Sequence, residues 1–344
     1  MIPHLLFFLL VFVHASKAQN IDSLARQLLS QYPNKSEISL AYYNKGQLHF
    51  FGYHKVDTSI HQLNNATSVF EIGSLSKVFT GYLLAEAIAN KKLKFNANIN
   101  QYIPVKFKKK AKISFVQLAN HCSGLPRLPD NIFAQFVEHP NNPYQSYSKN
   151  DLHDYLKYDA AFKNIGQFQY SNLGAALLGY ALCKKAKLSY ETYLQKSILQ
   201  PLSMHQTSTN RSKLQEKLVK GLDSEGNTVE YWDFDCIASA GALLSTAQDM
   251  MKFLQFQLSS QSKAVQIQQT VSFEDSLAVS VALSWLVLNK AQKSLLFHNG
   301  RTSGFSTAMA LNKQDQKAVV VLTNVSGMHS KVEAIDALCL DLVH

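Results

Sequence analysis

The spacing of hydrophobic and polar residues changes twice in the first quarter of the chain, and each change predicts a new kind of element. Over residues 21–32 the apolar positions recur every three or four residues, which is typical of an amphipathic helix. Residues 38–43 and 48–53 are rich in apolar and aromatic side chains and flank Asn44-Lys45-Gly46, a pattern that indicates a β-hairpin. Residues 74–88 return to helical spacing with so many apolar positions that we expect a helix packed into a core.

Helical spacing dominates the middle of the chain, from about residue 96 to 283, where loops containing Pro and Gly separate the segments. Residues 173–182 are one such apolar helix. Strand-like runs return near the end of the chain, with a turn at 312–316 and a final helix at 331–343. The predicted strands are residues 285–288, 295–298, 305–311 and 318–323.

Strands at both ends of a chain with helices between them predict an α/β protein of the α+β type. One antiparallel sheet would form from both chain ends, flanked by helices, and a mainly helical lobe would be inserted into it. We expect one domain over residues 19–344, with its α/β part at about 19–95 and 284–344 and its helical lobe at about 96–283. A seam between two such parts is a common place for a pocket.

The first 18 residues predict an export signal rather than part of the fold. Residues 5–13 are an unbroken apolar run, and Ser16-Lys17-Ala18 supplies the small residues of a cleavage site, so the mature protein would begin at Gln19. The apolar run is far shorter than the roughly 20 residues that span a bilayer as a helix. An uncleaved anchor helix is the alternative. We expect an exported protein, periplasmic or secreted, with no stable membrane span.

The composition is that of an ordinary globular protein, with 46% hydrophobic and 17% charged residues. The four cysteines have neither metal-ligand nor C-x-x-C spacing, which favours buried free thiols; they are Cys122, Cys183, Cys236 and Cys339. The net charge of +10 includes a lysine cluster at residues 106–112 that lacks the interleaved aromatic residues of a single-strand nucleic-acid groove. A solvated surface loop is the simpler interpretation of this cluster, and attraction to an acidic cell-wall polymer is the functional one.

A Ser-x-x-Lys motif supplies the first candidate chemistry. A serine hydroxyl is a weak nucleophile that needs a base within hydrogen-bond reach, and Ser74 and Lys77 would share one face of a helix. The lysine can act as that base only if burial or a neighbouring positive charge lowers its pKa from about 10.4. The motif recurs at 146/149 and 260/263, in polar stretches. Ser74 instead begins an apolar helix, where backbone amides are unpaired and can face a developing anion.

Two further motifs complete the candidate site. Tyr170-Ser171-Asn172 precedes the apolar helix at 173–182, and His298-Asn299-Gly300 ends a strand-like run. Tyr-x-Asn occurs twice more in the chain and is weak by itself, whereas His-x-Gly occurs once. We expect Gly300 to let a substrate backbone lie against the strand edge, and His298 to border the pocket.

In this order the three motifs resemble those of the serine β-lactamase and penicillin-binding family. Further segments are similar to its class C branch and to the DD-peptidase and esterase relatives of that branch. They are spread along the chain, so the resemblance extends over nearly all of it after residue 18. These segments are EIGSLSKVFTG (71–81), HCSGLP (121–126), QYSNLG (169–174), PLSMHQTS (201–208), AGALLSTAQDM (240–250) and AVVVLTN (318–324).

The resemblance implies a role for each matching residue. Ser74 would be the nucleophile, Lys77 the amine that accepts its proton, and Tyr170 the group that passes a proton to the leaving atom. Asn172 would hold the substrate amide. The oxyanion hole would come from the backbone amides of Ser74 and Arg301.

One departure from the family bears on the substrate. Class C β-lactamases usually carry Lys-Thr-Gly where this chain has His298-Asn299-Gly300, so an imidazole that is largely neutral near pH 7 replaces a permanent positive charge. We expect His298 to assist the proton network or to contact the substrate, with a satisfied structural histidine as the alternative. We place Asn299 with the substrate-binding residues. Arg301 either recognises a carboxylate through its guanidinium fork or points to solvent.

The predicted function is that of an exported, monomeric serine hydrolase without metal or organic cofactor. It would acylate Ser74 with the carbonyl of a cell-wall D-alanyl peptide or a β-lactam and release the acyl group to water. A carboxylesterase of the same fold is the closest alternative, because it uses the same chemistry. A non-hydrolytic penicillin-binding sensor and a structural protein that does not need Ser74 are the other two. No nucleic-acid partner is expected.

Overall fold

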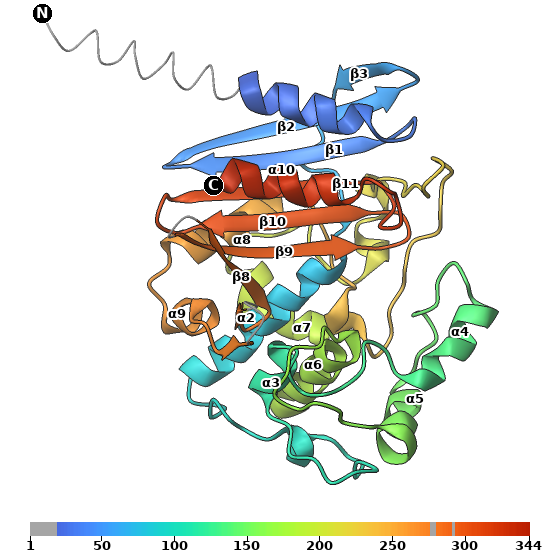
Figure 1. Ribbon diagram of the computed structural model, residues 1–344, viewed down its shortest axis with the longest axis vertical. Helices are drawn as coiled ribbons and strands as arrows, with labels where there is room; N and C mark the ends of the chain where they lie inside the picture. Colours follow the sequence, from blue (N-terminus) through green and yellow to red (C-terminus); the bar gives the residue numbers. More distant parts are fainter. Residues whose placement is uncertain (1–18, 276–279, 291–292) are drawn as a thin grey trace, which may run out of the picture.

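The fold is built around one large antiparallel sheet. It is seen in a computed structural model that describes residues 19–275, 280–290 and 293–344, so the predicted export signal lies outside the described residues. Nine strands of the described chain form the sheet in the order β3-β2-β1-β11-β10-β9-β8-β7-β6 (Figure 1). Their bounds are β1 Glu37–Asn44, β2 Gln47–Val56, β3 Ser59–Gln62, β6 Phe273–Glu274, β7 Ser280–Ala282, β8 Trp285–Lys290, β9 Lys293–Arg301, β10 Ser306–Asn312 and β11 Lys317–Thr323.

The two ends of the chain meet in the middle of this sheet. β1 pairs with β11, and Leu40 lies opposite Val321 in that ladder. The hairpin between β1 and β2 turns on Lys45 and Gly46, which both adopt positive φ, at 46° and 91°. Such a two-residue turn matches the twist of the strands it joins. The predicted sheet formed from both chain ends, and with it the fold class, is confirmed.

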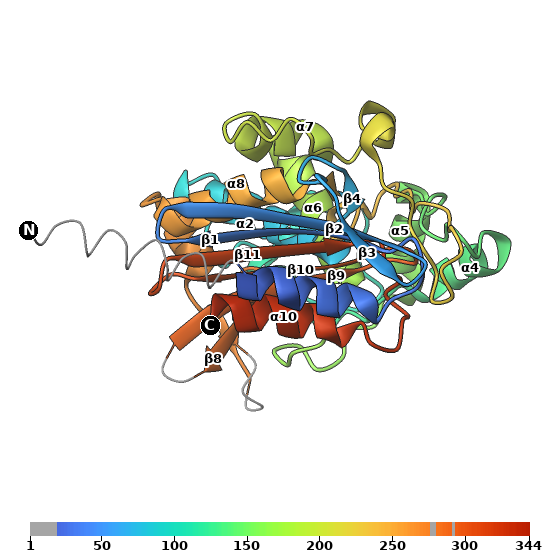
Figure 2. The same cartoon turned by 90° about the horizontal axis from the view of Figure 1, so that it is seen from above.

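Helices cover both faces of the sheet, so the protein has three layers. The helix at residues 19–30 and α10 (Glu333–Val343) lie side by side on one face, whereas α2 (Ser76–Ala89) and α8 (Ala247–Ser259) cover the other (Figure 2). The first pair packs on a cluster of buried residues that includes Leu29 and Leu338. The central strands β10 and β11 are buried along nearly their whole length, so both faces of the sheet need a cover of helices.

The helix that follows Ser74 is the centre of the second hydrophobic core. Almost every side chain of α2 is buried, and Phe79 stacks on Phe253 of α8 with ring centroids 4.2 Å apart. A helix that is apolar on all sides fits only between other elements, and α2 lies between the sheet and the remaining helices (Figure 1). Those helices are α3 Phe115–Ala119, α4 Phe133–Glu138, α5 Lys149–Asp154, α6 Asn172–Ala186, α7 Tyr190–Leu194 and α9 Lys263–Gln269; shorter turns are η1 Gly73–Leu75, η2 Ile99–Tyr102, η3 Asp130–Ile132, η4 Tyr155–Asp159, η5 Gln195–Leu199, η6 Arg211–Lys213, η7 Gln215–Lys217 and η8 Ala238–Ala240.

The stretch at 96–283 contributes more to the sheet region than its helical pattern indicates. β6 and β7 extend the sheet beyond β8, and α8 contacts β1, β10 and β11. A second, two-stranded sheet pairs β4 (Phe70–Glu71) with β5 (Leu244–Ser245), which ties this stretch to the residues just before Ser74. The division into an α/β part and an inserted lobe remains a prediction.

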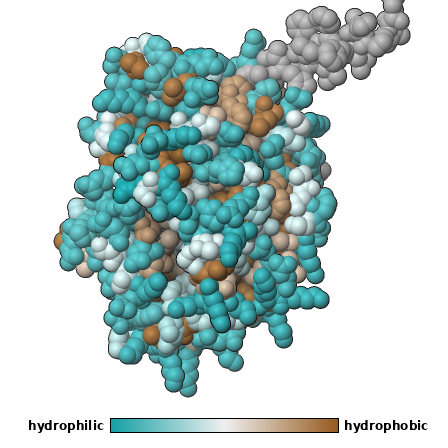
Figure 3. Space-filling model, turned by 180° about the vertical axis from the view of Figure 1, so that it is seen from behind, coloured by the Kyte–Doolittle hydropathy of each residue, from teal (hydrophilic) through white to brown (hydrophobic). Residues whose placement is uncertain are grey.

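The surface of the described protein is mostly polar. Polar residues cover most of the face opposite to that of Figure 1, with apolar residues in small groups between them (Figure 3). All five lysines of the 106–112 cluster are exposed, as expected for a solvated loop.

The four cysteines are free thiols, with Cys122 and Cys339 buried and the other two half-buried. In the described part of the chain, no helix has the length and apolar character needed to cross a membrane.

Candidate active site

Ser74 lies in the short turn η1, which leads directly into α2. Gly73 has a φ of +53°, a conformation that glycine adopts without strain, and it lets the chain turn sharply between β4 and the helix. A Cβ atom on Gly73 would lie 3.0 Å from the backbone nitrogen of Arg301, so this turn is held closely against β9. Ser74 is half-buried between buried neighbours, and it lines a pocket at this junction.

Lys77 is the base candidate, and its amine is in contact with the serine. The side chain is fully buried, and Nζ lies 2.9 Å from Ser74 Oγ and 2.6 Å from the carbonyl oxygen of Ala240. Burial holds the pKa of Lys77 well below its usual range, and the positive charge of Arg127 lowers it further. A neutral amine can donate to the Ala240 carbonyl and still accept a proton from the hydroxyl. The predicted pair therefore has the geometry that nucleophile activation requires.

Tyr170 lies close to the same amine. Its ring centroid is 5.1 Å from Lys77 Nζ. Burial raises the pKa of Tyr170 to about 12, although a side-chain hydrogen bond with Ser74 opposes this shift. The phenol is consequently protonated at neutral pH and can donate a proton toward the site.

His121 supports Tyr170 and was not singled out as a site residue from the sequence. Its ring lies against that of Tyr170, with centroids 4.5 Å apart, and its Nδ1 accepts a hydrogen bond from the Ser171 amide at 3.1 Å. Burial and the nearby Lys77 hold the pKa of His121 well below its usual range. The only sequence signal for it is its place at the start of the family-like segment 121–126.

His298 is buried on β9 and faces the same group of residues. Its ring centroid is 6.4 Å from that of Tyr170, and its Nδ1 lies 2.7 Å from the carbonyl oxygen of Asn299. Burial lowers the pKa of His298 to about 3. A neutral ring that donates through Nδ1 leaves Nε2 as an acceptor. The residue thus has both a structural hydrogen bond and a place beside the proton network.

The side chains of Asn299 and Arg301 do not reach the substrate region in the way the sequence suggested. Asn299 Nδ2 donates to Asp336 Oδ2 at 2.6 Å, and the Arg301 guanidinium forms an ion pair of 2.7 Å with Asp336 Oδ1. Asp336 belongs to α10 on the opposite face of the sheet, and successive strand residues point to opposite faces. The guanidinium of Arg301 is engaged by a protein carboxylate, so neither a free fork for substrate nor a solvent-facing side chain is observed.

Gly300 also has a different purpose from the one expected. A Cβ atom at this position would lie 2.1 Å from the carbonyl oxygen of Ile72 and 2.5 Å from Thr307 Oγ1. The Thr307 hydroxyl donates to the same Ile72 carbonyl at 2.9 Å. Glycine is required here because the segment before Ser74 packs on β9, and the space is filled by protein rather than left for substrate.

The backbone of Arg301, in contrast to its side chain, is available to the pocket. The Thr302 amide donates to the Phe305 carbonyl at 2.9 Å, which fixes the alternation of the β9–β10 ladder. In that alternation the Arg301 amide points away from β10, and β8 pairs with β9 only between Phe297 and Lys293. Arg301 and Ser74 line the same pocket, so both backbone amides can serve an oxyanion.

Asn172 and three aromatic residues form the rest of the pocket wall. The backbone N–H of Asn172 donates to the Arg127 carbonyl at 3.0 Å where α6 begins. The side-chain Oδ1 of Asn172 is buried without a hydrogen-bond partner in the described structure. Tyr144 stacks on Phe234 with centroids 5.1 Å apart, and Trp232 meets Tyr144 edge-on at 4.9 Å. These aromatic residues line the pocket with Asn172, and sequence reasoning missed them.

Glu71 fixes the aromatic wall from behind. Its Oε1 accepts the backbone N–H of Trp232 at 2.6 Å, and burial raises the pKa of Glu71 from 4.5 to about 7. Because this folded-state pKa lies above the unfolded value, the contribution of Glu71 to the free energy of unfolding should fall as pH rises from 4.5 through 7, by about 3 kcal/mol.

Glu71→Gln is expected to remove this pH dependence while keeping the hydrogen bond to Trp232. Urea unfolding at pH 4.5 and pH 8 would measure it, and the variant should gain about 3 kcal/mol relative to the native chain between the two values. Glu138→Gln, at an exposed glutamate of α4, is the matched control and should show no such gain. Equal slopes for Glu71→Gln and the native chain would contradict the assignment.

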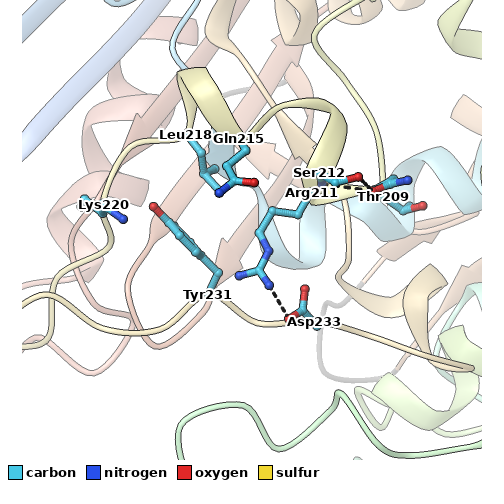
Figure 4. Close-up of a pocket in the computed structure, with 9 residues that line it drawn as sticks. Thr209, Arg211, Ser212, Gln215, Leu218, Lys220, Tyr231 and Asp233 are labelled. Atoms are coloured by element: carbon cyan, nitrogen blue, oxygen red, sulfur yellow. Dashed lines mark hydrogen bonds and ion pairs between the residues drawn. The ribbon is translucent and has the colours of Figure 1, made fainter.

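A larger cavity, of about 730 Å³, lies behind the segment 231–234 but carries no comparable chemistry (Figure 4). Tyr231 and Asp233 face this cavity, whereas Trp232 and Phe234 face Ser74. Asp233 forms an ion pair of 2.8 Å with Arg211 across the cavity wall, as the dashed line in Figure 4 marks. Alternate residues of one segment therefore line two cavities, and the ion pair anchors the wall that they share.

Among residues 19–275, 280–290 and 293–344, no group of His, Cys, Asp or Glu residues could hold a metal ion.

The sequence is similar to a protein-family model and to several bacterial proteins. A family model described as Beta-lactamase matches residues 25–341. Protein flp of Staphylococcus aureus (strain MRSA252) is 27% identical over 299 residues, and a Beta-lactamase of Providencia stuartii is 27% identical over 248 residues. These alignments cover 82% and 70% of this chain but 57% and 60% of the relatives, so the chain spans little more than half of their length.

Solved structures share the fold over nearly the whole chain. The crystal structure of a β-lactamase/D-alanine carboxypeptidase from Yersinia pestis, complexed with citrate, aligns with a TM-score of 0.74 at 21% identity and covers 95% of this chain and 99% of that one. A class C β-lactamase from Rhodobacter sphaeroides aligns with a TM-score of 0.77 at 19% identity and covers 94% and 100%. At this identity the likeness establishes the architecture alone.

Proposed function

The chain belongs to the beta-lactamase family, and from that premise we propose that it is a serine hydrolase that forms an acyl-enzyme on Ser74. The observation that carries the proposal is the 2.9 Å contact between Ser74 Oγ and the buried amine of Lys77, whose pKa burial holds well below its usual range. A lysine can be stable at that depth without a carboxylate partner only in its neutral form, which is the form a general base needs.

The proposed reaction has two stages, acylation of Ser74 and hydrolysis of the acyl-enzyme. Ser74 Oγ bonds to the substrate carbonyl carbon while its proton passes to Lys77 Nζ, and the backbone amides of Ser74 and Arg301 stabilise the oxyanion. The bond to the leaving nitrogen or oxygen then breaks as Tyr170 donates its proton to that atom and is reprotonated from Lys77. Water next attacks the acyl carbon by the same proton route, which releases the acid and restores the serine hydroxyl.

The leading substrates in this proposal are D-alanyl peptides or β-lactams. The Yersinia pestis neighbour is described as a β-lactamase/D-alanine carboxypeptidase, which supports amide substrates of this kind. The closest alternative is a carboxylic ester, because an aromatic wall of Tyr144, Trp232 and Phe234 suits an apolar acyl group. A non-hydrolytic sensor would share the first step and lack the second.

Parallel kinetics distinguish these possibilities. We expect the native chain to hydrolyse at least one of a chromogenic cephalosporin, a D-alanyl-D-alanine peptide and a short-chain p-nitrophenyl ester, and Ser74→Ala to hydrolyse none. Mass spectrometry after incubation with a penicillin should show a transient adduct on Ser74. A persistent adduct would indicate a sensor, and a normal rate in Ser74→Ala would exclude the proposed nucleophile.

The acid limb of the pH–rate profile should depend on Arg127. The charge of this residue helps to lower the pKa of Lys77, so Arg127→Gln raises that pKa and more alkaline solution is needed to deprotonate the amine. We expect the midpoint of the acid limb of kcat/KM to move to higher pH in Arg127→Gln and to stay in place in Arg127→Lys. An unchanged or lowered midpoint in Arg127→Gln would contradict this coupling.

Export is a further part of the proposal, supported by the sequence of residues 1–18. The apolar run at 5–13 followed by Ser16-Lys17-Ala18 predicts cleavage before Gln19. N-terminal sequencing of the protein recovered from a bacterial periplasm should begin at Gln19. Recovery of the intact chain from the cytoplasm alone would contradict export.

A further inference from the structure

The charged groups around the pocket leave one cation unused. Burial lowers the pKa values of Lys77 and His298, and Arg301 is paired with Asp336. Arg127 is different, because its side chain is exposed and none of the ion pairs formed by the described residues involves it. A guanidinium that remains solvated beside a catalytic pocket can exchange its water for an anion at small desolvation cost.

The backbone around Arg127 fixes its place at the rim of the site. Its carbonyl oxygen accepts the amides of Asn172 and Leu173 at 3.0 and 3.1 Å, so the residue is joined to the first turn of α6. Its guanidinium carbon lies 5.4 Å from the centroid of the Tyr170 ring. The charge of Arg127 also acts on Tyr144 of the aromatic wall. Arg127 is thus close to the residue proposed to protonate the leaving group and to the residue proposed to hold the substrate amide.

We propose that Arg127 is the specificity-determining residue of this site and that it binds a carboxylate carried by the substrate. The inference rests on the proposed function and adds the class of substrate: acyl compounds with an anionic group within reach of the rim. The planar guanidinium can donate two parallel hydrogen bonds to a carboxylate, which a lysine amine cannot do in the same geometry. This assigns to Arg127 the carboxylate recognition that the third motif and the Arg301 side chain do not supply.

Two matched pairs of substrates test the proposal and locate the carboxylate. The first pair is mono-p-nitrophenyl succinate against p-nitrophenyl butyrate, which differ by a carboxylate in place of a methyl group at the end of the acyl chain. The second is an acetylated D-alanyl-D-alanine dipeptide against its C-terminal amide, which differ on the leaving group. Within each pair the ratio of kcat/KM values cancels any effect of Arg127 on Lys77, because both members use the same base.

We expect the native chain to prefer the anionic member of at least one pair by about threefold to tenfold, the range for a charge-assisted contact at an exposed site. Arg127→Gln should bring that ratio close to one, and Arg127→Lys should keep part of it. Arg26→Gln is the matched control, because Arg26 also lies over a tyrosine ring, 4.4 Å from Tyr53, but on the helix at residues 19–30. It should leave the ratio unchanged.

The outcomes separate this inference from the proposed function. If the native chain hydrolyses the substrates but Arg127→Gln leaves both ratios unchanged, Arg127 does not bind the carboxylate and the serine hydrolase proposal stands. Loss of the preference in Arg26→Gln as well would show a general effect of charge and overturn the inference. No hydrolysis of any substrate would overturn the proposed function and this inference with it.

Discussion

Lys77→Met is expected to lower kcat/KM by about a thousandfold or more for every substrate that the native chain hydrolyses. The amine is the group in contact with Ser74 Oγ, at 2.9 Å, and losing a general base that activates a nucleophile costs at least that much in enzymes where the two act together. Methionine has nearly the same length and no charge, so it can occupy the buried channel of the lysine stem. Steady-state kinetics, with circular dichroism to verify the fold, would measure the effect.

The same variant has a predicted effect on stability with a definite sign. The folded-state pKa of Lys77 lies below the unfolded value, so the unfolded chain binds the extra proton and the contribution of Lys77 to native stability rises with pH up to about 10.4. Lys77→Met lacks this slope and should be more stable than the native chain at pH 7, with the difference shrinking toward pH 10. Lys110→Met, at an exposed lysine, is the control for both measurements. Full activity of Lys77→Met would mean that another group deprotonates the serine.

Gly300→Ala is expected to lower the free energy of unfolding by about 3 kcal/mol or more. The added methyl group would lie 2.1 Å from the Ile72 carbonyl oxygen, so β9 and the segment before Ser74 must move apart in a closely packed region. Urea unfolding would measure the loss, and activity should fall with it because Ser74 follows that segment. The variant therefore tests the tight packing of β9 rather than substrate contact.

Two further variants keep this prediction testable if Gly300→Ala does not fold. Thr307→Val removes the hydrogen bond to Ile72, at 2.9 Å, without adding volume, and should cost about 1 kcal/mol. Gly46→Ala, where φ is +91° and no other atom lies within 4 Å, should cost about 1 kcal/mol through backbone strain alone. If Gly300→Ala is no less stable than Gly46→Ala, the close approach at Gly300 is not what the structure indicates.

The elements that could be predicted from the sequence are those with several buried apolar residues in a regular pattern or an unbroken run. The strand expected at 318–323 is β11, Lys317–Thr323, and the helix expected at 331–343 is α10, Glu333–Val343. The strand expected at 295–298 extends three residues further, to Arg301. Asn299, Gly300 and Arg301 have no strand-like pattern of their own, and pairing with β10 holds them extended. Pairing of this kind depends on the partner strand rather than on local sequence.

Strands that are exposed or very short were not predictable. Three of the four residues of β3, Ser59–Gln62, are exposed, so its sequence has no hydrophobic side to recognise, and backbone pairing with β2 stabilises it. β6 and β7 have two and three residues, too few for a period to appear. β7 pairs with β8 and β6 pairs with β7, so backbone pairing rather than a local pattern forms these strands.

The candidate site divides along the same line between local and distant contacts. The relation of Ser74 to Lys77 is fixed by one helical turn, so the sequence sufficed to predict it. The direction of the Arg301 side chain depends on the register of β9 and on its contact with a carboxylate of α10. Neither can be inferred from the residues around Arg301. The contact of Glu71 with Trp232 joins residues 161 positions apart, and such contacts appear only once the chain is folded.

The position of the two helices on the outer face of the sheet has a practical consequence. The helix at residues 19–30 and α10 lie together there, across the sheet from α2 (Figure 2). A linker, fluorophore or biotin attached before residue 19 or after His344 would project from that outer face. The protein could accordingly be immobilised on a sensor surface by either end, with the face of the sheet that α2 and α8 cover turned toward the flowing solution.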